Sequence, residues 1–257
     1  MNRTFSLGDH ELTRIGLGTN RLSATPADRS FLEEAVEAGV EFIDTAHLYT
    51  DGESEATIGA TLSPYPEGLV VATKGGYEPS GGVARLRDEL ERSFERLRID
   101  CITLYYLHRV HADTPLEEAM ELLAGYVQEG RIEHVGLSEV NVEQIERARA
   151  VVPISAVQNE YSVSQRMHEA VLRHCEAEGI AFVSFYPLKK GEDPPRLREL
   201  AEAHDATPSQ IRLAWLLGQG HQVVPIPGTR SIEHLEENLG ALELELARAE
   251  LEALSAG

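Results

Sequence analysis

Four polar residues are spaced along this sequence as one catalytic site would be if each side chain stood at the end of a β-strand. Asp44 and Tyr49 lie at and just after the end of a short apolar run, and Lys74 and His108 each end another run. In an α/β barrel the carboxyl ends of all strands meet at one face, which carries the active site. These four side chains can therefore meet although they are distant in sequence.

Together the four side chains suit the protonation of an oxygen on which negative charge develops. A tyrosine phenol, with an ordinary pKa of about 10, is a poor proton donor at neutral pH, and a nearby ammonium group lowers that pKa. We expect Lys74 to supply this ammonium group to Tyr49, and Asp44 to keep the buried lysine charged. His108 can donate a hydrogen bond to a carbonyl oxygen and orient it. Reduction of a carbonyl group by hydride requires this chemistry, and the hydride must come from a cofactor.

Each of these residues also has a simpler interpretation. Asp44 alone suits a helix cap, Tyr49 a packed aromatic ring and Lys74 a surface charge. A lysine at a strand end can also form a Schiff base, as in a lyase or aldolase, but a carboxylate partner opposes the deprotonation this needs. A third alternative is a regulatory subunit that binds the cofactor and has weak reductase activity. Because the four residues occur together on three expected strand ends, they favour the reductase.

Other motif-like spacings carry less weight. His108 and His111 form a His-x-x-His pair, but no cysteine or carboxylate follows at ligand spacing, so we expect no metal site. The segment 16–21 lacks the third glycine of a Rossmann-type dinucleotide fingerprint. Cys101 and Cys175 are the only cysteines, so there is no disulfide framework.

The elements that must position the four residues alternate between strand and helix patterns along the chain. Short apolar runs read as eight buried parallel strands at 15–18, 40–44, 69–74, 102–108, 132–138, 155–158, 180–185 and 223–226. Helical patterns lie between them at 26–38, 83–97, 115–129, 142–151, 164–178 and 208–217. A hairpin signal flanks Gly8-Asp9 at 4–7 and 11–15, two more helices are expected at 232–240 and 247–254, and 191–195 reads as a loop. This pattern predicts a single (β/α)8 TIM barrel with an N-terminal β-hairpin and extra C-terminal helices.

Length and composition agree with one globular domain over residues 1–257. Hydrophobic residues make up 42% and charged residues 26% of the chain, and no apolar run approaches the roughly 18 residues of a membrane span. The N-terminal segment has neither a basic start nor an apolar core, so no secretory signal is visible. We therefore expect a cytoplasmic protein that does not bind membranes and is a monomer or a weak homo-oligomer.

The charge balance is strongly acidic. Lys and Arg total 23 against 43 Asp and Glu, which gives a formal net charge of −20, and only three of the basic residues are lysines. Such a surface repels nucleic acid, so we expect no nucleic-acid partner. At about 1 M salt the Debye length falls to roughly 3 Å, which screens the self-repulsion. We therefore hypothesise a halophilic source, with an ordinary acidic cytosolic protein as the alternative.

The residues resemble the aldo-keto reductase family over nearly the whole chain. The motifs that carry the resemblance, in order, are Gly16-Leu17-Gly18-Thr19, Asp44-Thr45-Ala46 with Tyr49, Ala72-Thr73-Lys74-Gly75-Gly76, Leu107-His108-Arg109, Gly136-Leu137-Ser138, Val157-Gln158-Asn159, and Ile226-Pro227-Gly228-Thr229-Arg230-Ser231 with Glu237-Asn238. The resemblance implies a barrel that binds NADPH or NADH in extended form and transfers hydride to a small-molecule aldehyde or ketone without a metal. It also implies that Tyr49 is the general acid, that Lys74 and Asp44 tune it, and that His108 positions the carbonyl.

The resemblance further implies a set of cofactor-binding residues. Ser138 and Gln158 match positions that bond the nicotinamide carboxamide, and Phe185 matches the aromatic residue that stacks on its ring. Arg230 suits bidentate binding of a 2′-phosphate, which favours NADPH, with NADH possible. The full set is Gly18, Thr19, Asp44, Ser138, Gln158, Phe185, Pro187, Leu188, Ile226, Gly228, Thr229, Arg230, Ser231, His234, Glu237 and Asn238. Many relatives continue into a long C-terminal loop over the substrate, so with the sequence ending at Gly257 we expect an open pocket with weak discrimination.

Overall fold

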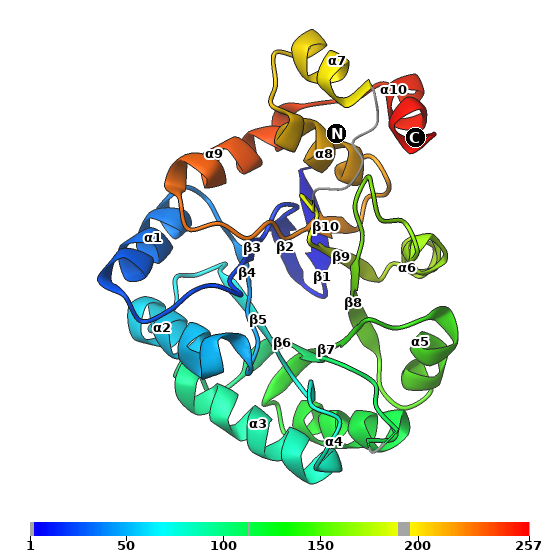
Figure 1. Cartoon of the computed structure of the whole chain (residues 1–257). Coiled ribbons are helices and arrows are strands. Elements are labelled where there is room, and N and C mark those ends of the chain that lie inside the picture. The colour runs from blue at the N-terminus through cyan, green and yellow to red at the C-terminus, as the bar shows by residue number, and fades with distance from the viewer. Residues whose placement is uncertain (1–2, 113, 190–195, 257) are drawn as a thin grey trace.

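A computed structural model describes residues 3–112, 114–189 and 196–256 of the chain. Figure 1 looks into a barrel whose strands lie inside a ring of helices, with the blue N-terminal hairpin in the centre of the view. This confirms the expected (β/α)8 barrel with an N-terminal hairpin and additional helices after the last strand.

The eight parallel strands lie side by side in the order in which they occur in the chain. They are β3 (Leu17–Gly18), β4 (Phe42–Asp44), β5 (Val70–Gly75), β6 (Ile102–Leu107), β7 (Ile132–Ser138), β8 (Ile154–Glu160), β9 (Ala181–Phe185) and β10 (Val223–Pro225). The sheet closes on itself because the N–H groups of Gly16 and Gly18 donate to the carbonyl oxygens of Pro225 and Pro227 at 3.1 and 3.2 Å. A Cβ atom on Gly18 would lie 2.9 Å from the carbonyl oxygen of Ile226, so this seam needs a glycine there.

Helices cover the outside of the sheet. They are α1 (Pro26–Glu37), α2 (Glu53–Leu62), α3 (Gly82–Leu97), α4 (Leu116–Gln128), α5 (Val142–Arg149), α6 (Glu169–Glu178), α7 (Arg196–Ala203), α8 (Pro208–Leu217), α9 (Ile232–Gly240) and α10 (Arg248–Ser255), with short 3-10 turns at Tyr49–Gly52 and Ala241–Glu243. Several begin where the sequence provides a side-chain cap: Thr25 accepts from the backbone N–H of Asp28 at the start of α1, and Asn141 and Thr207 form capping boxes at α5 and α8.

The hairpin fills the amino-terminal end of the barrel. It consists of β1 (Thr4–Leu7) and β2 (His10–Thr13), which pair antiparallel across the Gly8-Asp9 turn. Phe5, Leu7 and Leu12 are buried and pack in one cluster with residues from the inner face of the strands. The hairpin therefore closes the face of the barrel opposite to the strand carboxyl ends.

Some expected elements differ from the structure. The second hairpin strand lies at His10–Thr13 rather than 11–15, and helix α6 begins at Glu169 rather than 164. The reason for the later start is a turn in which Ser162 and Gln165 exchange backbone hydrogen bonds of 2.9 and 3.2 Å. Helices α2 and α7 were not expected, and the expected loop at 191–195 lies outside the described residues. Among the helices of the described residues, none combines the length and the apolar character needed to cross a membrane.

Candidate active site

The ammonium group of Lys74, at the end of β5, joins the other polar residues at the carboxyl face. Its Nζ atom donates to Oδ1 of Asp44 at 2.6 Å, to the carbonyl oxygen of Thr45 at 2.7 Å and to the phenol oxygen of Tyr49 at 3.4 Å. A charged ammonium group has three donors and no acceptor, so these three acceptors satisfy it completely. Tyr49 accepts from Lys74, which leaves the phenol's own proton free to point away from the lysine.

Lys74 and Asp44 form a fully buried ion pair. Both side chains are almost inaccessible to solvent, and Nε2 of Gln158 donates to the second carboxylate oxygen of Asp44 at 2.6 Å. Burial lowers the pKa of Lys74, but the adjacent Asp44 and Tyr49 raise it by more. The net pKa of Lys74 therefore lies above its ordinary value. The lysine is therefore charged, which argues against a Schiff base because an ammonium group cannot attack a carbonyl.

The pKa of Tyr49 corrects one expectation from the sequence. Burial of the phenol raises its pKa above the ordinary value, and the Lys74 ammonium opposes this rise without reversing it. The expected net lowering was wrong because the barrel removes the ring from water as well as bringing it to the lysine. Tyr49 is therefore protonated at neutral pH.

His108, at the end of β6, lies beside Tyr49 in the same cavity. Its ring centroid is 6.1 Å from that of Tyr49 and 4.9 Å from that of Tyr77, in edge-to-face arrangements. Burial, together with the charges of Lys74 and Arg109, holds the pKa of His108 well below its ordinary value. Its Nδ1 atom is buried and has no hydrogen-bond partner within the described residues. The imidazole is therefore neutral, with one ring nitrogen as donor and the other as acceptor.

The loop that carries Tyr49 is anchored from behind by a charged cluster. Arg96 of α3 donates to the carbonyl oxygen of His47 at 3.1 Å and to Oε2 of the fully buried Glu55 at 3.2 Å. Glu55 also accepts from Thr73 at 2.6 Å, one residue before Lys74. The loop needs this support because Thr50, next to Tyr49, has a φ of 48°, in the left-handed region. The cluster ties Tyr49 and Lys74 to the same buried framework.

An open cavity of about 620 Å³ lies over these groups. Most residues expected to bind substrate or cofactor line its wall: Gly18, Thr19, Asp44, Tyr49, His108, Ser138, Gln158, Phe185, Pro187, Leu188, Ile226 and Gly228. Lys74 does not line the wall itself, but its hydrogen-bond partners Asp44 and Tyr49 do. The structure thus brings the expected groups from β3 to β10 to one cavity.

The expected residues at the start of α9 lie outside this wall. Ser231 caps the helix by accepting from the N–H of His234 at 3.3 Å, and Thr229 accepts from the N–H of Ser231 at 3.1 Å. The guanidinium group of Arg230 is 53% exposed and lies 3.6 Å from a carboxylate oxygen of Asp28 on α1.

The remaining expected residues on α9 differ in how they are held. Glu237 accepts from the Thr207 hydroxyl at 2.6 Å, whereas His234 is exposed and Asn238 is buried. This set follows Gly228, which lines the cavity, along the chain, but does not itself line it.

Several cavity residues were not among those expected from the sequence. They are Asn20, Arg21, Leu48, Thr50, Tyr77, Arg109, Tyr186, Lys189 and Pro227. Arg109 is the most connected of them, since it donates to the carbonyl oxygen of His108 at 2.6 Å and to the hydroxyl of Ser138 at 3.1 Å, and lies 5.4 Å from the Tyr77 ring centroid. All follow strand ends closely, which is the signal that could have found them.

The residues present fit a nicotinamide cofactor. Ser138 accepts from Arg109 and so keeps its own hydroxyl proton for a ligand, and the Gln158 amide keeps its carbonyl oxygen after donating to Asp44. Phe185 is half-buried in the cavity wall in edge contact with Tyr186, at 5.2 Å between ring centroids. Oε1 of Glu139, the residue after Ser138, accepts a hydrogen bond from the backbone N–H of Glu160 at 2.8 Å. The wall thus presents amide and hydroxyl groups and an aromatic ring.

Comparisons with known proteins agree with this geometry. The sequence matches the Aldo/keto reductase family over residues 14–193 and 192–256. It is 34% identical to a Schizosaccharomyces pombe protein named as an NADP(+) aldo-keto reductase (yakc), over 96% of this chain and 88% of that one. The fold is similar to a thermostable aldo-keto reductase solved with the inhibitor epalrestat, with a TM-score of 0.90, 32% identity and 98% of both chains covered. It is also similar to an aldo/keto reductase from Klebsiella pneumoniae solved with NADP and acetate, with a TM-score of 0.88, 27% identity, and 100% and 95% of the chains covered.

Proposed function

The chain belongs to the aldo/keto reductase family, and from that premise we propose that it reduces an aldehyde or ketone to an alcohol with NADPH, using Tyr49, Lys74, Asp44 and His108. The observation that carries the proposal is the position of the Lys74 ammonium group between the carboxylate of Asp44 and the phenol of Tyr49. This arrangement places a protonated phenol, backed by a positive charge, in the wall of a cavity large enough for a small ligand.

Each of the four residues has a separate task. The neutral ring of His108 donates a hydrogen bond to the substrate carbonyl oxygen and fixes its orientation, while Tyr49 donates its proton to that oxygen as negative charge develops there. When bound, the reduced nicotinamide supplies the hydride. Lys74 stabilises the phenolate that Tyr49 becomes, and Asp44 stabilises Lys74 in its charged form.

The raised pKa of Tyr49 is compatible with this role. An alkoxide forming on the substrate is a stronger base than a phenolate, so the proton moves downhill from Tyr49 even though burial has raised its pKa. A protonated phenol at every pH near neutrality also keeps the acid ready in each turnover. The positive charge of Lys74 stabilises the transition state more than the ground state, because the phenolate of Tyr49 develops only in the transition state. Such a difference is what raises the rate.

We assign the binding of the cofactor to the cavity wall and to the expected residues at the start of α9. Ser138 and Gln158 have free hydrogen-bonding groups for a carboxamide, and Phe185 offers an aromatic face in the wall. Arg230 would recognise a 2′-phosphate, because an exposed guanidinium group that lies 3.6 Å from the carboxylate of Asp28 can exchange that partner for a phosphate. The NADP named for the two relatives above supports NADPH as the preferred cofactor.

The proposal includes a broad carbonyl substrate class and residence in the cytoplasm. The open cavity mixes aromatic, apolar and cationic lining, which favours weak discrimination among small carbonyl compounds. Two cysteines without a disulfide, Cys101 and Cys175, are compatible with a reducing compartment. We treat residues 1–257 as one catalytic domain that acts as a monomer or weak homo-oligomer.

The test is steady-state oxidation of NADPH with a panel of aldehydes, quinones and dicarbonyls, in low and in molar salt. Formation of the matching alcohol should accompany NADPH loss for at least one class. If no compound in the panel is reduced at either salt concentration, the reductase proposal fails. Borohydride trapping in parallel should give no adduct on Lys74; a trapped adduct would favour the Schiff-base alternative.

A further inference from the structure

Three potential metal ligands converge at the end of the barrel opposite to the catalytic cavity. They are His10 on β2 of the hairpin and Glu133 and His134 near the start of β7, and one ligand atom from each lies within 4.8 Å of the others. Nε2 of His10 and Oε2 of Glu133 are already 2.9 Å apart. Within the part of the chain that the structure describes, no other group of three His, Cys, Asp or Glu side chains converges in this way.

The ring of His134 is held in place for a ligand role. Its Nδ1 atom lies 3.1 Å from the hydroxyl of Ser155 on β8, and a hydrogen bond at this nitrogen leaves Nε2 to coordinate an ion. The hairpin turn lies directly against the same ring, because a Cβ on Gly8 would be 2.3 Å from Nε2 of His134. The φ of Gly8 is 58°, so glycine permits both the turn and the close approach.

We propose that His10, Glu133 and His134 bind a divalent ion of the zinc class and thereby fasten the N-terminal hairpin to β7. Two imidazoles and one carboxylate are donors that suit Zn²⁺, and three protein ligands leave further positions for water. The negative charge of the protein favours cation binding at this face as elsewhere.

The site is separate from the proposed reductase chemistry. His134 and the cavity residue Ser138 lie on the same strand, four residues apart, which corresponds to about 13 Å of extended chain. The ion would therefore act on the attachment of the hairpin and not on the carbonyl substrate. Sequence spacing gave no sign of such a site, because His10 and His134 are far apart in the chain and meet only when the hairpin closes the barrel.

The test is calorimetric titration of untagged, chelator-treated protein with ZnCl₂. We expect one saturable equivalent per chain for the unchanged protein, and at least a tenfold loss of affinity in His10→Ala and in His134→Ala. Glu133→Gln keeps the side-chain size and should also weaken binding. The absence of saturable binding, or equal binding by all of these variants, would overturn the proposal.

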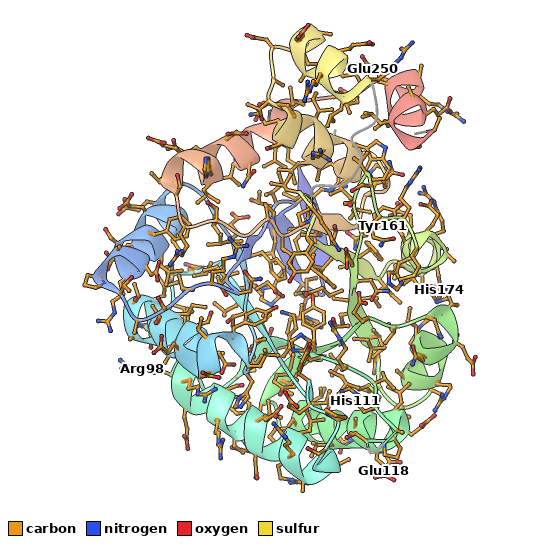
Figure 2. All side chains as sticks on the ribbon, in the orientation of Figure 1. Arg98, His111, Glu118, Tyr161, His174 and Glu250 are labelled. Atoms are coloured by element: carbon orange, nitrogen blue, oxygen red, sulfur yellow. The ribbon has the colours of Figure 1, made fainter. Side chains whose placement is uncertain are left out.

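A matched control is His174→Ala. His174 lies 3.0 Å from Glu146, as His10 lies close to Glu133, but it has no second histidine beside it, and Figure 2 shows it at the outer edge of the molecule near α6. This variant should bind zinc as the unchanged protein does; a loss equal to that of His10→Ala would show adventitious surface binding and overturn the proposal.

Amide hydrogen exchange distinguishes zinc binding from a purely structural role of the histidines, because only zinc binding makes the exchange rate depend on zinc. Zinc should slow amide exchange in 4–13 of the unchanged protein and not in His134→Ala, while NADPH oxidation stays the same in both. If zinc does not change the amide exchange rate of the hairpin in the unchanged protein, the proposed attachment of the hairpin by zinc is wrong.

Discussion

The ammonium nitrogen of Lys74 lies 3.4 Å from the phenol oxygen of Tyr49, and the lysine donates in this contact. The direction of the hydrogen bond decides what Tyr49 can do, because an oxygen that accepts from Lys74 keeps its own proton for another acceptor. Burial makes this phenol a weaker acid, and the charge of Lys74 opposes that effect without reversing it.

Tyr49→Phe should remove most turnover. A general acid contributes about 10²- to 10⁴-fold to rate, so we expect kcat for carbonyl reduction to fall within that range. The ring and its packing remain, so NADPH affinity, measured by calorimetric titration, should stay near that of the unchanged protein. Retained kcat would take Tyr49 out of the acid role.

Lys74→Met should destabilise the fold because it leaves the buried Asp44 carboxylate without its partner. Removal of one member of a buried ion pair costs about 3–5 kcal/mol in the free energy of unfolding, which urea denaturation followed by circular dichroism measures. The double variant Lys74→Met/Asp44→Asn should recover part of this loss because it removes the stranded charge. A double variant no more stable than Lys74→Met would show that the ion pair is not the cause.

The pH dependence of kcat/KM for reduction should be flat around neutrality. The pKa of His108 lies well below its ordinary value of 6.5, so the imidazole is neutral above pH 6.5. The pKa of Tyr49 lies above 10.0, so the phenol is protonated below pH 10. Neither group changes protonation between about pH 7 and pH 9, and activity should fall on the alkaline side as Tyr49 loses its proton. An acid limb near pH 6.5 that disappears in His108→Asn would contradict the neutral imidazole.

Arg230→Gln should reduce the preference for NADPH over NADH. Loss of a charge-assisted hydrogen bond costs about 1.5–3 kcal/mol, so KM for NADPH should rise by roughly tenfold or more while KM for NADH changes little. Arg248→Gln is the control, because Arg248 is an exposed arginine on α10 that pairs with Glu252. An unchanged enzyme with a higher kcat/KM for NADH than for NADPH would reject the role of Arg230.

Molar salt should stabilise the protein if its net charge of −20 reflects a saline environment. Screening at about 1 M salt shortens the Debye length to roughly 3 Å and weakens repulsion among surface carboxylates. We expect the midpoint of thermal unfolding to rise between low salt and 1 M KCl. A midpoint that stays constant or falls would remove the halophilic hypothesis.

Much of the barrel could be predicted from the sequence because its signals are local. Each of the eight strands is a short apolar run, and Lys74 and His108 stand directly at the ends of two of them. Helix α2 was missed because Thr57, Ile58 and Gly59 are poor helix formers, and its packing against α3 overrides that preference.

What depends on tertiary structure could not be read in this way. The direction of the Tyr49 pKa shift follows from burial, which no spacing reveals, and the hydrogen bond between Asp44 and Gln158 joins β4 to β8. The charged support of the Tyr49 loop by Arg96 has the same origin, since the helix that carries Arg96 meets the loop only in the folded barrel.

The order of the strands divides the tasks that we propose for the site residues between two halves of the chain. Asp44, Tyr49, Lys74 and His108 all come from β4 to β6 and the segments after them, whereas Ser138, Gln158 and the α9 residues come from β7 onward. A chain cut between β6 and β7 would therefore place the proposed proton donor in one fragment and most of the proposed cofactor-binding residues in the other. Turnover recovered on mixing two such fragments would then report their reassembly into one barrel.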